Sequence, residues 1–415
     1  MDRTMQKAIS ISMAILMFSG CSPSEDIPPA MILSETRGDT LIVTNDGALA
    51  ANTVFTLEYA RAIGDPDDDP SRTFIQPHYA SVDGDGNVHV LDRDETGPGY
   101  ATRVVVFRAN GRHLKTWGSE GRGPTDLGMN ISINALPSGD VAIGGFHLTR
   151  VFDSDGRLQR EWRTLATQSE GGWIPRGGPR EVYYLEEDNI TYIRTWRNPE
   201  PGSPRCSYAI ALLQPGGALI LEFATLEIEH AYFREGGFGM VMPWLPELVG
   251  TATQDGSVYW GETNKPEYNR YDVGTERFMR VILGLEPIPL TQSEIDETVR
   301  RKAALPGGRT SEDWFEWARG LPYPDFKPFY DSINVDVAGN VWLRESLGGW
   351  TEVPRFLEPR QFVQYHVINP EGIYLGRAMA PAVIIHISDS HVFSMEKEEK
   401  YGARQIVTYR LIPNN

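Results

Sequence analysis

Cysteine is scarce in this chain: among its 415 residues only Cys21 and Cys206 carry a thiol. A framework of several disulfides is therefore excluded, so an apolar core must hold the fold. Hydrophobic residues make up 40% of the sequence and aromatic residues 10%, and a chain of this length can bury a large core without covalent staples. Cys206 has no patterned histidine partner, and we interpret it as a small buried apolar residue.

Positive charge is also scarce, because 39 lysines and arginines stand against 56 aspartates and glutamates, a formal net charge of −17. An acidic protein repels phosphate backbones, which argues against nucleic acid as a partner. Common catalytic motifs are missing as well: the sequence has no G-x-S-x-G nucleophile elbow, no Walker phosphate loop and no HExxH zinc motif. The enzyme classes that depend on those motifs are therefore not predicted.

Long hydrophobic runs are absent, and the apolar stretch near the N-terminus, residues 8–18, is too short to cross a bilayer. It follows Arg3 and Lys7, so residues 1–20 are predicted to be an export signal peptide. The signal ends in Phe18-Ser19-Gly20-Cys21, which resembles the bacterial lipobox. This resemblance implies that Cys21 is acylated and that residues 21–38 form a tether. The alternatives are an ordinary signal peptide cleaved nearby and an N-terminal membrane anchor.

The predicted location is therefore the bacterial cell envelope, with the membrane contacted through the lipid anchor only. Ser22 rather than an aspartate follows Cys21, and the lipobox resemblance then favours the outer membrane, on its periplasmic or surface side.

Repetition is what the sequence does contain. Residues 79–118 hold four strand-like runs separated by turn signals such as Asn110-Gly111, which supply the positive φ that tight hairpins need. Copies of this unit recur at residues 131–162, about 173–223, 248–282 and 333–377, and three further strands end the chain. A repeated four-stranded unit of this length predicts an all-β, six-bladed β-propeller with antiparallel blades over residues 39–415. Residues 54–63 are predicted to supply the missing strand and close the ring.

The first unit also resembles a known family. Gly86-Asn87-Val88, the later Asn110-Gly111 and the run ending at Pro124 are similar to the NHL-type six-bladed propellers, and especially to bacterial propeller lipoproteins. The resemblance implies a ring-shaped domain with a central channel and loop-built faces. It implies no single activity, because such propellers serve as scaffolds, as peptide or sugar binders, and sometimes as enzymes.

Residues 285–327 interrupt the repeat and replace the strand period by a helix period. Thr291 and Glu294 have capping-box spacing and predict a helix start. The segment is rich in aromatic residues, which can stack on sugars or clamp a peptide. The candidate binding residues are Trp314, Trp317, Tyr323 and Phe326. The alternative is that these side chains form a small satellite core that pins the insertion onto the propeller.

Two functions follow from these features. The first is an envelope-tethered binding or scaffold module, expected to be a monomer, for a peptide, glycan or envelope protein. The second is a metal-dependent, lactonase-like hydrolase or lyase with Ca²⁺ or Zn²⁺ in the channel, although no residue pattern supports a cofactor or a catalytic residue. Asp83 and Asp336 end equivalent inner strands and either face the channel or bind the backbone N–H groups of the adjacent turn.

Overall fold

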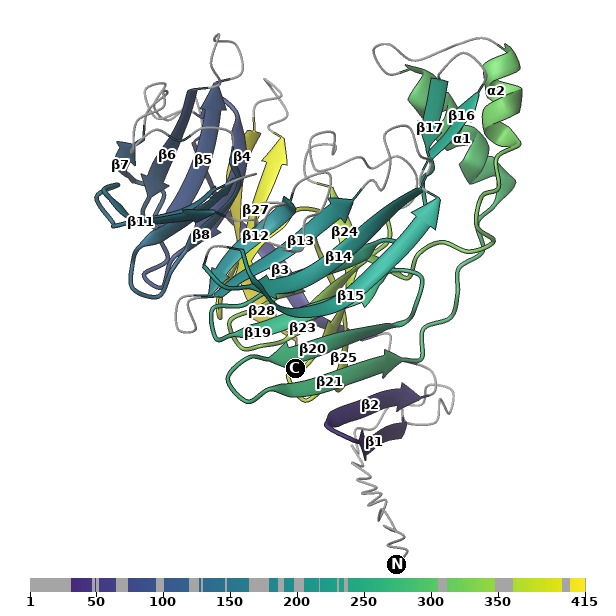
Figure 1. Ribbon diagram of the computed structural model, residues 1–415, viewed down its shortest axis with the longest axis horizontal. Helices are drawn as coiled ribbons and strands as arrows, with labels where there is room; N and C mark the ends of the chain where they lie inside the picture. Colours follow the sequence, from purple (N-terminus) through teal and green to yellow (C-terminus); the bar gives the residue numbers. More distant parts are fainter. Residues whose placement is uncertain are drawn as a thin grey trace, which may run out of the picture.

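A computed structural model describes residues 31–46, 49, 52–64, 74–94, 101–118, 127, 130–145, 148–163, 179–185, 190–197, 205–215, 217–229, 231–234, 238–304, 312–347, 361–397 and 404–414 (Figure 1). The described strands include six antiparallel units of four, arranged as the blades of a propeller, and some of these units join further strands or one another in larger sheets. The predicted all-β class and the six-bladed ring are thereby confirmed.

The first three blades follow one another along the chain. Blade 1 contains β4 (Pro77–Val82), β5 (Val88–Asp94), β6 (Ala101–Phe107) and β7 (His113–Trp117). Blade 2 contains β8 (Asn130–Ala135), β9 (Val141–Gly145), β10 (Leu148–Phe152) and β11 (Leu158–Arg163). Blade 3 contains β12 (Pro179–Leu185), β13 (Ile190–Arg197), β14 (Arg205–Leu213) and β15 (Leu219–Glu229). The third copy, whose turn signals are blurred in the sequence, is therefore a complete blade.

The remaining blades complete the ring. Blade 4 contains β18 (Leu248–Ala252), β19 (Ser257–Glu262), β20 (Glu267–Asp272) and β21 (Arg277–Leu283). Blade 5 contains β22 (Tyr330–Val335), β23 (Val341–Glu345), β24 (Phe362–Ile368) and β25 (Tyr374–Pro381). Blade 6 contains β26 (Ile384–Ile387), β27 (His391–Lys397), β28 (Arg404–Pro413) and, from the other end of the chain, β3 (Thr53–Ile63).

The ring closes through the pairing of β3 with β28. The two strands are antiparallel, from Ile406 opposite Ile63 to Pro413 opposite Phe55. This is the closure predicted for residues 54–63. The first strands of the six blades touch in the cyclic order β4, β8, β12, β18, β22, β26 and back to β4.

The apolar core lies between neighbouring blades, as expected when each sheet must bury both faces. Leu91 and Val104 of blade 1 pack with Ile133 and Ile143 of blade 2. On the other side of blade 1, further apolar side chains of β5 and β6 pack with Phe393 and other residues of blade 6.

The segment before β3 departs from the sequence prediction. Residues 21–38 were expected to be a tether, whereas β1 (Met31–Arg37) pairs antiparallel with β2 (Thr40–Asp46), so regular structure begins at residue 31. β2 in turn adds in parallel to the outer strand of blade 4, from Thr40 opposite Phe278 to Asn45 opposite Leu283. The Asn45 side chain, 1% exposed, donates to the carbonyl of Gly372 at 2.9 Å and accepts from the N–H of Tyr374 at 2.8 Å. The N-terminal hairpin therefore joins blades 4 and 5.

The two ends of the propeller differ in their connections. Successive strands run antiparallel, so the first and third connections of each blade lie at one end and the others lie at the opposite end. At the first end, which we call the turn face, the connections are short, as at residues 83–87, 136–140 and 336–340. At the other end, the loop face, the connections include residues 64–76, 118–129, 230–247 and 284–329.

Two insertions extend the loop face on either side of blade 4. The first is a hairpin of β16 (Ala231–Arg234) and β17 (Phe238–Val241), and the second contains α1 (Gln292–Ala304) and α2 (Glu312–Arg319). Figure 1 shows the hairpin and both helices together, projecting beyond the strands of the propeller. Within the described residues, neither helix has the length and apolar character needed to span a bilayer.

Candidate functional site

The insertion begins with the capping box that the sequence predicts. The N–H of Thr291 donates to Glu294 Oε2 at 3.0 Å, and the N–H of Glu294 points back to Thr291 Oγ1 at 3.4 Å. Lys327, from the far end of the insertion, forms an ion pair with Glu294. Burial opposes ionisation of Glu294, but the bonds from Lys327 and Thr291 outweigh it and lower the pKa of this carboxyl. The two ends of the insertion are thus tied together.

The helices carry a small core of their own. Ile295, Val299 and Ala303 of α1 pack with Trp314 and Ala318 of α2, as the helical stripe in the sequence predicts. Trp244, from the connection that follows β17, is 8% exposed and lies in the same cluster. We call this cluster the satellite core, and its buried members belong to none of the clusters between blades.

Two extended segments link the satellite core to the propeller, and we call them the neck (residues 286–290 and 324–327). The N–H of Leu290 donates to the carbonyl of Asp325, and the N–H of Lys327 donates to the carbonyl of Ile288, both at 2.9 Å. Pro289 and Phe326 stand opposite each other in this short antiparallel pairing. Phe326 is 48% exposed and shares a face of this pairing with exposed Pro289, so the neck presents an apolar patch to solvent. Ile288, which is 43% exposed, lies opposite Lys327 on the other face.

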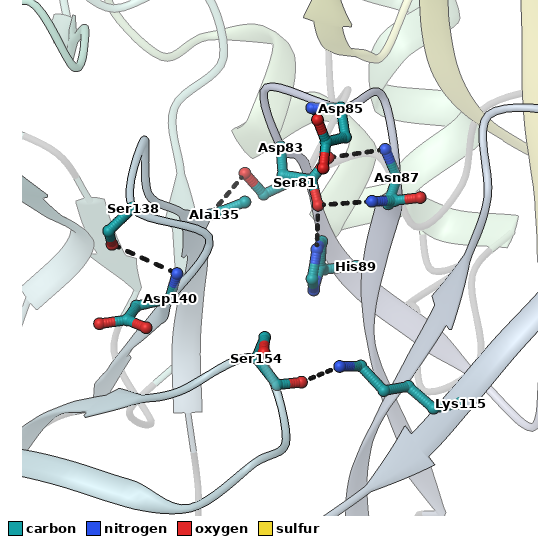
Figure 2. A network of polar contacts seen from close by, with 10 residues as sticks. All are labelled: Ser81, Asp83, Asp85, Asn87, His89, Lys115, Ala135, Ser138, Asp140 and Ser154. Atoms are coloured by element: carbon teal, nitrogen blue, oxygen red, sulfur yellow. Dashed lines mark hydrogen bonds and ion pairs between the residues drawn. The ribbon is translucent and has the colours of Figure 1, made fainter.

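A second group of polar residues lies on the turn face at blade 1 (Figure 2). Asp83 Oδ1 accepts from the N–H groups of Asp85 at 3.0 Å and Asn87 at 2.8 Å. Its Oδ2 accepts from Asn87 Nδ2 at 2.9 Å and lies 3.0 Å from His89 Nε2. Burial opposes ionisation of Asp83, but the bonds from His89 and Asn87 prevail and lower its pKa. An ionised carboxylate only accepts, so His89 carries its proton on Nε2.

Blade 5 repeats this arrangement with a different donor. Asp336 accepts from the N–H of Asn340 at 2.7 Å, from Asn340 Nδ2 at 2.8 Å and from Trp342 Nε1 at 3.1 Å. The indole N–H of Trp342 therefore takes the place of the imidazole N–H of His89. Of the two roles predicted for Asp83 and Asp336, the structure shows the binding of backbone N–H groups. Because an indole serves as well as an imidazole at this position, the geometry requires only a donor there.

The described residues contain no group of three or more His, Cys, Asp or Glu side chains placed to hold a metal ion. Two histidines are nevertheless held in unusual surroundings. Burial, with a smaller contribution from Arg377, lowers the pKa of His366 to about 4, and burial lowers that of His386 to about 4. Both rings are neutral at physiological pH, and His366 Nδ1 lies 3.1 Å from the hydroxyl of Tyr374.

Comparisons with known proteins support the fold. No protein-family model and no curated protein matches the chain. A DUF4221-family protein from Bacteroides vulgatus superposes with a TM-score of 0.52 at 10% identity, covering 88% of this chain and 99% of that one. At this identity the likeness shows the fold alone. The NHL-type relationship and the lipoprotein assignment remain predictions.

Two further structures are less similar. A Bacteroides fragilis protein described as exported gives a TM-score of 0.46 at 10% identity, over 91% of this chain and 100% of that one. A virginiamycin B lyase from Staphylococcus aureus gives 0.37 at 12% identity, over 86% and 100%. At these TM-scores neither structure informs the function of this chain.

The structure divides the residues predicted to bind a ligand. Trp314 is 9% exposed and lies in the satellite core. Trp317 and Tyr323 are half-buried against that core, and the hydroxyl of Tyr323 donates to the carbonyl of Ala318 at 2.9 Å. Phe326 alone of the four is exposed. Cys21 lies outside the described residues.

Two residues important to this region were not predicted. Ile288 lies between Pro287 and Pro289, where the sequence shows no helix or strand period, and its exposure depends on the pairing with the second neck segment. Trp244 follows Pro243 and adopts a φ of 60°. A bulky residue rarely adopts this conformation, so the Pro-Trp pair gives no signal in the sequence for a turn of this type.

Proposed function

We propose that this chain is an envelope-tethered binding module that docks a partner protein on its loop face, through the apolar patch of the neck. The exposure of Phe326 on the face that it shares with Pro289 is the observation that carries this proposal. The other aromatic residues of the insertion pack inward, whereas these two side chains face solvent on a segment held by backbone hydrogen bonds. Large exposed apolar side chains of this kind anchor protein interfaces.

The neck is suited to binding because it is already ordered. Pro287 and Pro289 flank Ile288, and Pro324 precedes Asp325, so the backbone has little freedom to lose when a partner docks. The ion pair of Lys327 with Glu294 fixes the neck to the first turn of α1. A preorganised surface loses less conformational entropy on association than a mobile loop.

A protein is favoured over a glycan by the chemistry of the patch. Sugar recognition combines an aromatic face with several polar groups that fix orientation. Here Phe326 stands opposite exposed Pro289, and the exposed polar side chains of the neck are the carboxylates of Glu286 and Asp325. This composition fits an apolar side chain of a partner better than a ring of hydroxyl groups.

Site-specific photocrosslinking in the native envelope tests the proposal. A photoreactive residue at position 326 is expected to give a discrete adduct with a second protein, identified by mass spectrometry. Tyr59 is 56% exposed on β3 and gives the matched control, because it is a large exposed residue outside the insertion. Equal adducts from positions 326 and 59, or none from 326, would contradict the proposal.

The variant Ile288→Ser with Phe326→Ser separates loss of binding from loss of fold. Each side chain is about half exposed, so the change in the free energy of unfolding should be about 1 kcal/mol for each. The double variant should lose the adduct formed from a probe at position 290 while it still unfolds in a single cooperative transition. Retention of that adduct would show that the patch is not the docking surface.

A further inference from the structure

The outer edges of the blades are protected in different ways. A strand that pairs on one side only exposes unpaired N–H and C=O groups along its other side. In blade 4 the outer strand β21 is covered by β2. In blades 5 and 6 the outer strands β25 and β3 pair with each other, with Arg377 opposite Thr53 and Ala378 opposite Phe55. In blades 1 and 2 the outer strands β7 and β11 have 5 and 6 residues.

Blade 3 is the exception. Its outer strand β15 has 11 residues and pairs only with β14 within the described part of the chain. Figure 1 shows β15 at the outer side of its sheet. Leu221, Phe223 and Leu226 of this strand pack toward blade 4, against the cluster that contains Trp260 and Tyr271. The face of β15 toward blade 4 is therefore fixed, while no strand of the described residues pairs with its outer edge.

The exposed side chains of β15 give this edge a defined chemistry. Glu222, Thr225 and Glu227 are exposed, and Leu219 and Ile220 at the start of the strand are 44% and 43% exposed. Within the described residues, the carboxylate of Glu222 accepts a hydrogen bond from the hydroxyl of Thr225 at 2.7 Å. The edge thus combines unpaired backbone groups, an apolar start and negative charge.

We propose that the outer edge of β15 binds an extended, basic segment of a partner protein, which adds to blade 3 as a fifth strand. The chain shows that its blades accept such an addition, because β2 occupies the corresponding edge of blade 4. Backbone hydrogen bonds supply affinity in this mode of binding, and alternate side chains supply specificity. Lysine or arginine at alternate positions would face Glu222 and Glu227 across the new strand pair.

The same carboxylates act against the competing occupant, a second copy of β15. Two copies would bring glutamates of equal charge together, which is unfavourable for directly opposed residues. Register shifts at Ile210/Ala211 and Leu212/Leu213, where β15 bulges against β14, further distort a symmetric edge-to-edge pairing. Negative charge and bulges therefore select a basic partner strand over self-association.

The test uses a ten-residue peptide of alternating lysine and valine, labelled at one end, with binding followed by fluorescence anisotropy. The peptide should bind the full folded domain, and binding should weaken at high salt because the charges are at the surface. A peptide of the same sequence that is N-methylated at alternate residues should bind at least tenfold more weakly, since it cannot complete the backbone ladder. Equal binding of the two peptides would overturn the proposal.

Charge variants locate the site. Glu222→Lys with Glu227→Lys should weaken binding of the alternating peptide at least tenfold. Glu316→Lys with Glu371→Lys changes the net charge equally at exposed positions away from β15 and should leave binding within twofold. Equal losses in the two double variants would mean that overall negative charge attracts the peptide and that β15 is not its site. Unfolding midpoints of both variants report whether the fold is retained.

Discussion

Replacing Trp314 by alanine should unfold the helical insertion and leave the propeller intact. Trp314 is 9% exposed and contacts the satellite core, which shares no buried residue with the clusters between blades. Truncation of a buried tryptophan costs about 3–5 kcal/mol. The helices have 13 and 8 residues, too short to persist in water without packing. Their stability therefore depends on the core from which this side chain is removed.

Hydrogen exchange measured by mass spectrometry resolves the two parts. A loss of about 3–5 kcal/mol in local opening free energy corresponds to a decrease in protection of roughly 10²- to 5 × 10³-fold in α1 and α2. Protection in β22 and β23 of the neighbouring blade should be unchanged. Phe326→Ala serves as the control, because its side chain is about half exposed and lies outside the satellite core, so its removal should change protection in both regions far less.

The reasoning is refuted if Trp314→Ala lowers protection across the blades or shifts the urea midpoint of the whole domain. That result would mean that the satellite core and the propeller unfold as one cooperative unit. Adding Trp317→Ala should lower protection in α1 and α2 further and leave protection in the blades unchanged, because Trp317 packs against the same core.

Three further predictions concern stability and attachment. Asp336→Ala leaves the N–H of Asn340 and Nε1 of Trp342 without their acceptor and should reduce the free energy of unfolding by about 2–4 kcal/mol, measured by urea titration, whereas exposed Asp389→Ala should not. His366 has a pKa of about 4 in the folded protein, against an ordinary value of 6.5. Between these pH values the unfolded chain binds a proton at His366 and the folded protein does not, so the free energy of unfolding should fall by about 3 kcal/mol as the pH drops from 6.5 to 4. His366→Gln should remove that part of the pH dependence, and an unchanged acid slope would refute the assignment. Metabolic labelling with palmitate should mark the wild-type protein but not Cys21→Ala, and equal labelling would show that Cys21 is not the lipidated residue.

Much of the propeller could be predicted because its signals are local. Each hairpin turn carries its own glycine, such as Gly86 and Gly339, whose φ values of 79° and 84° suit residues without a side chain. The capping box of Thr291 and Glu294 spans four residues and marks the start of α1. The closing strand β3 was predicted by counting, since one blade lacked a strand.

The rest depends on contacts between distant segments. β1 has the sequence MILSETR and pairs with β2. β2 in turn pairs with β21, more than 200 residues away. No turn signal accompanies a parallel pairing of this kind. The candidate site shows the same limit: composition indicates an aromatic insertion, but only the folded neck shows that Phe326 is exposed while Trp314 is buried.

The pairing of β3 with β28 also sets the order in which the fold can be completed. These strands are separated by about 350 residues, so blade 6 cannot form until the last residues of the chain are available. During synthesis or export β3 must wait, with the edge that β28 will cover unpaired, until the final strand emerges. A chain shortened before residue 404 would keep the strands of blades 1 to 5 but leave β3 without β28. We expect such a chain to be retained by chaperones or removed by proteases. Only a chain that has been made and exported to its end can then close the ring and persist.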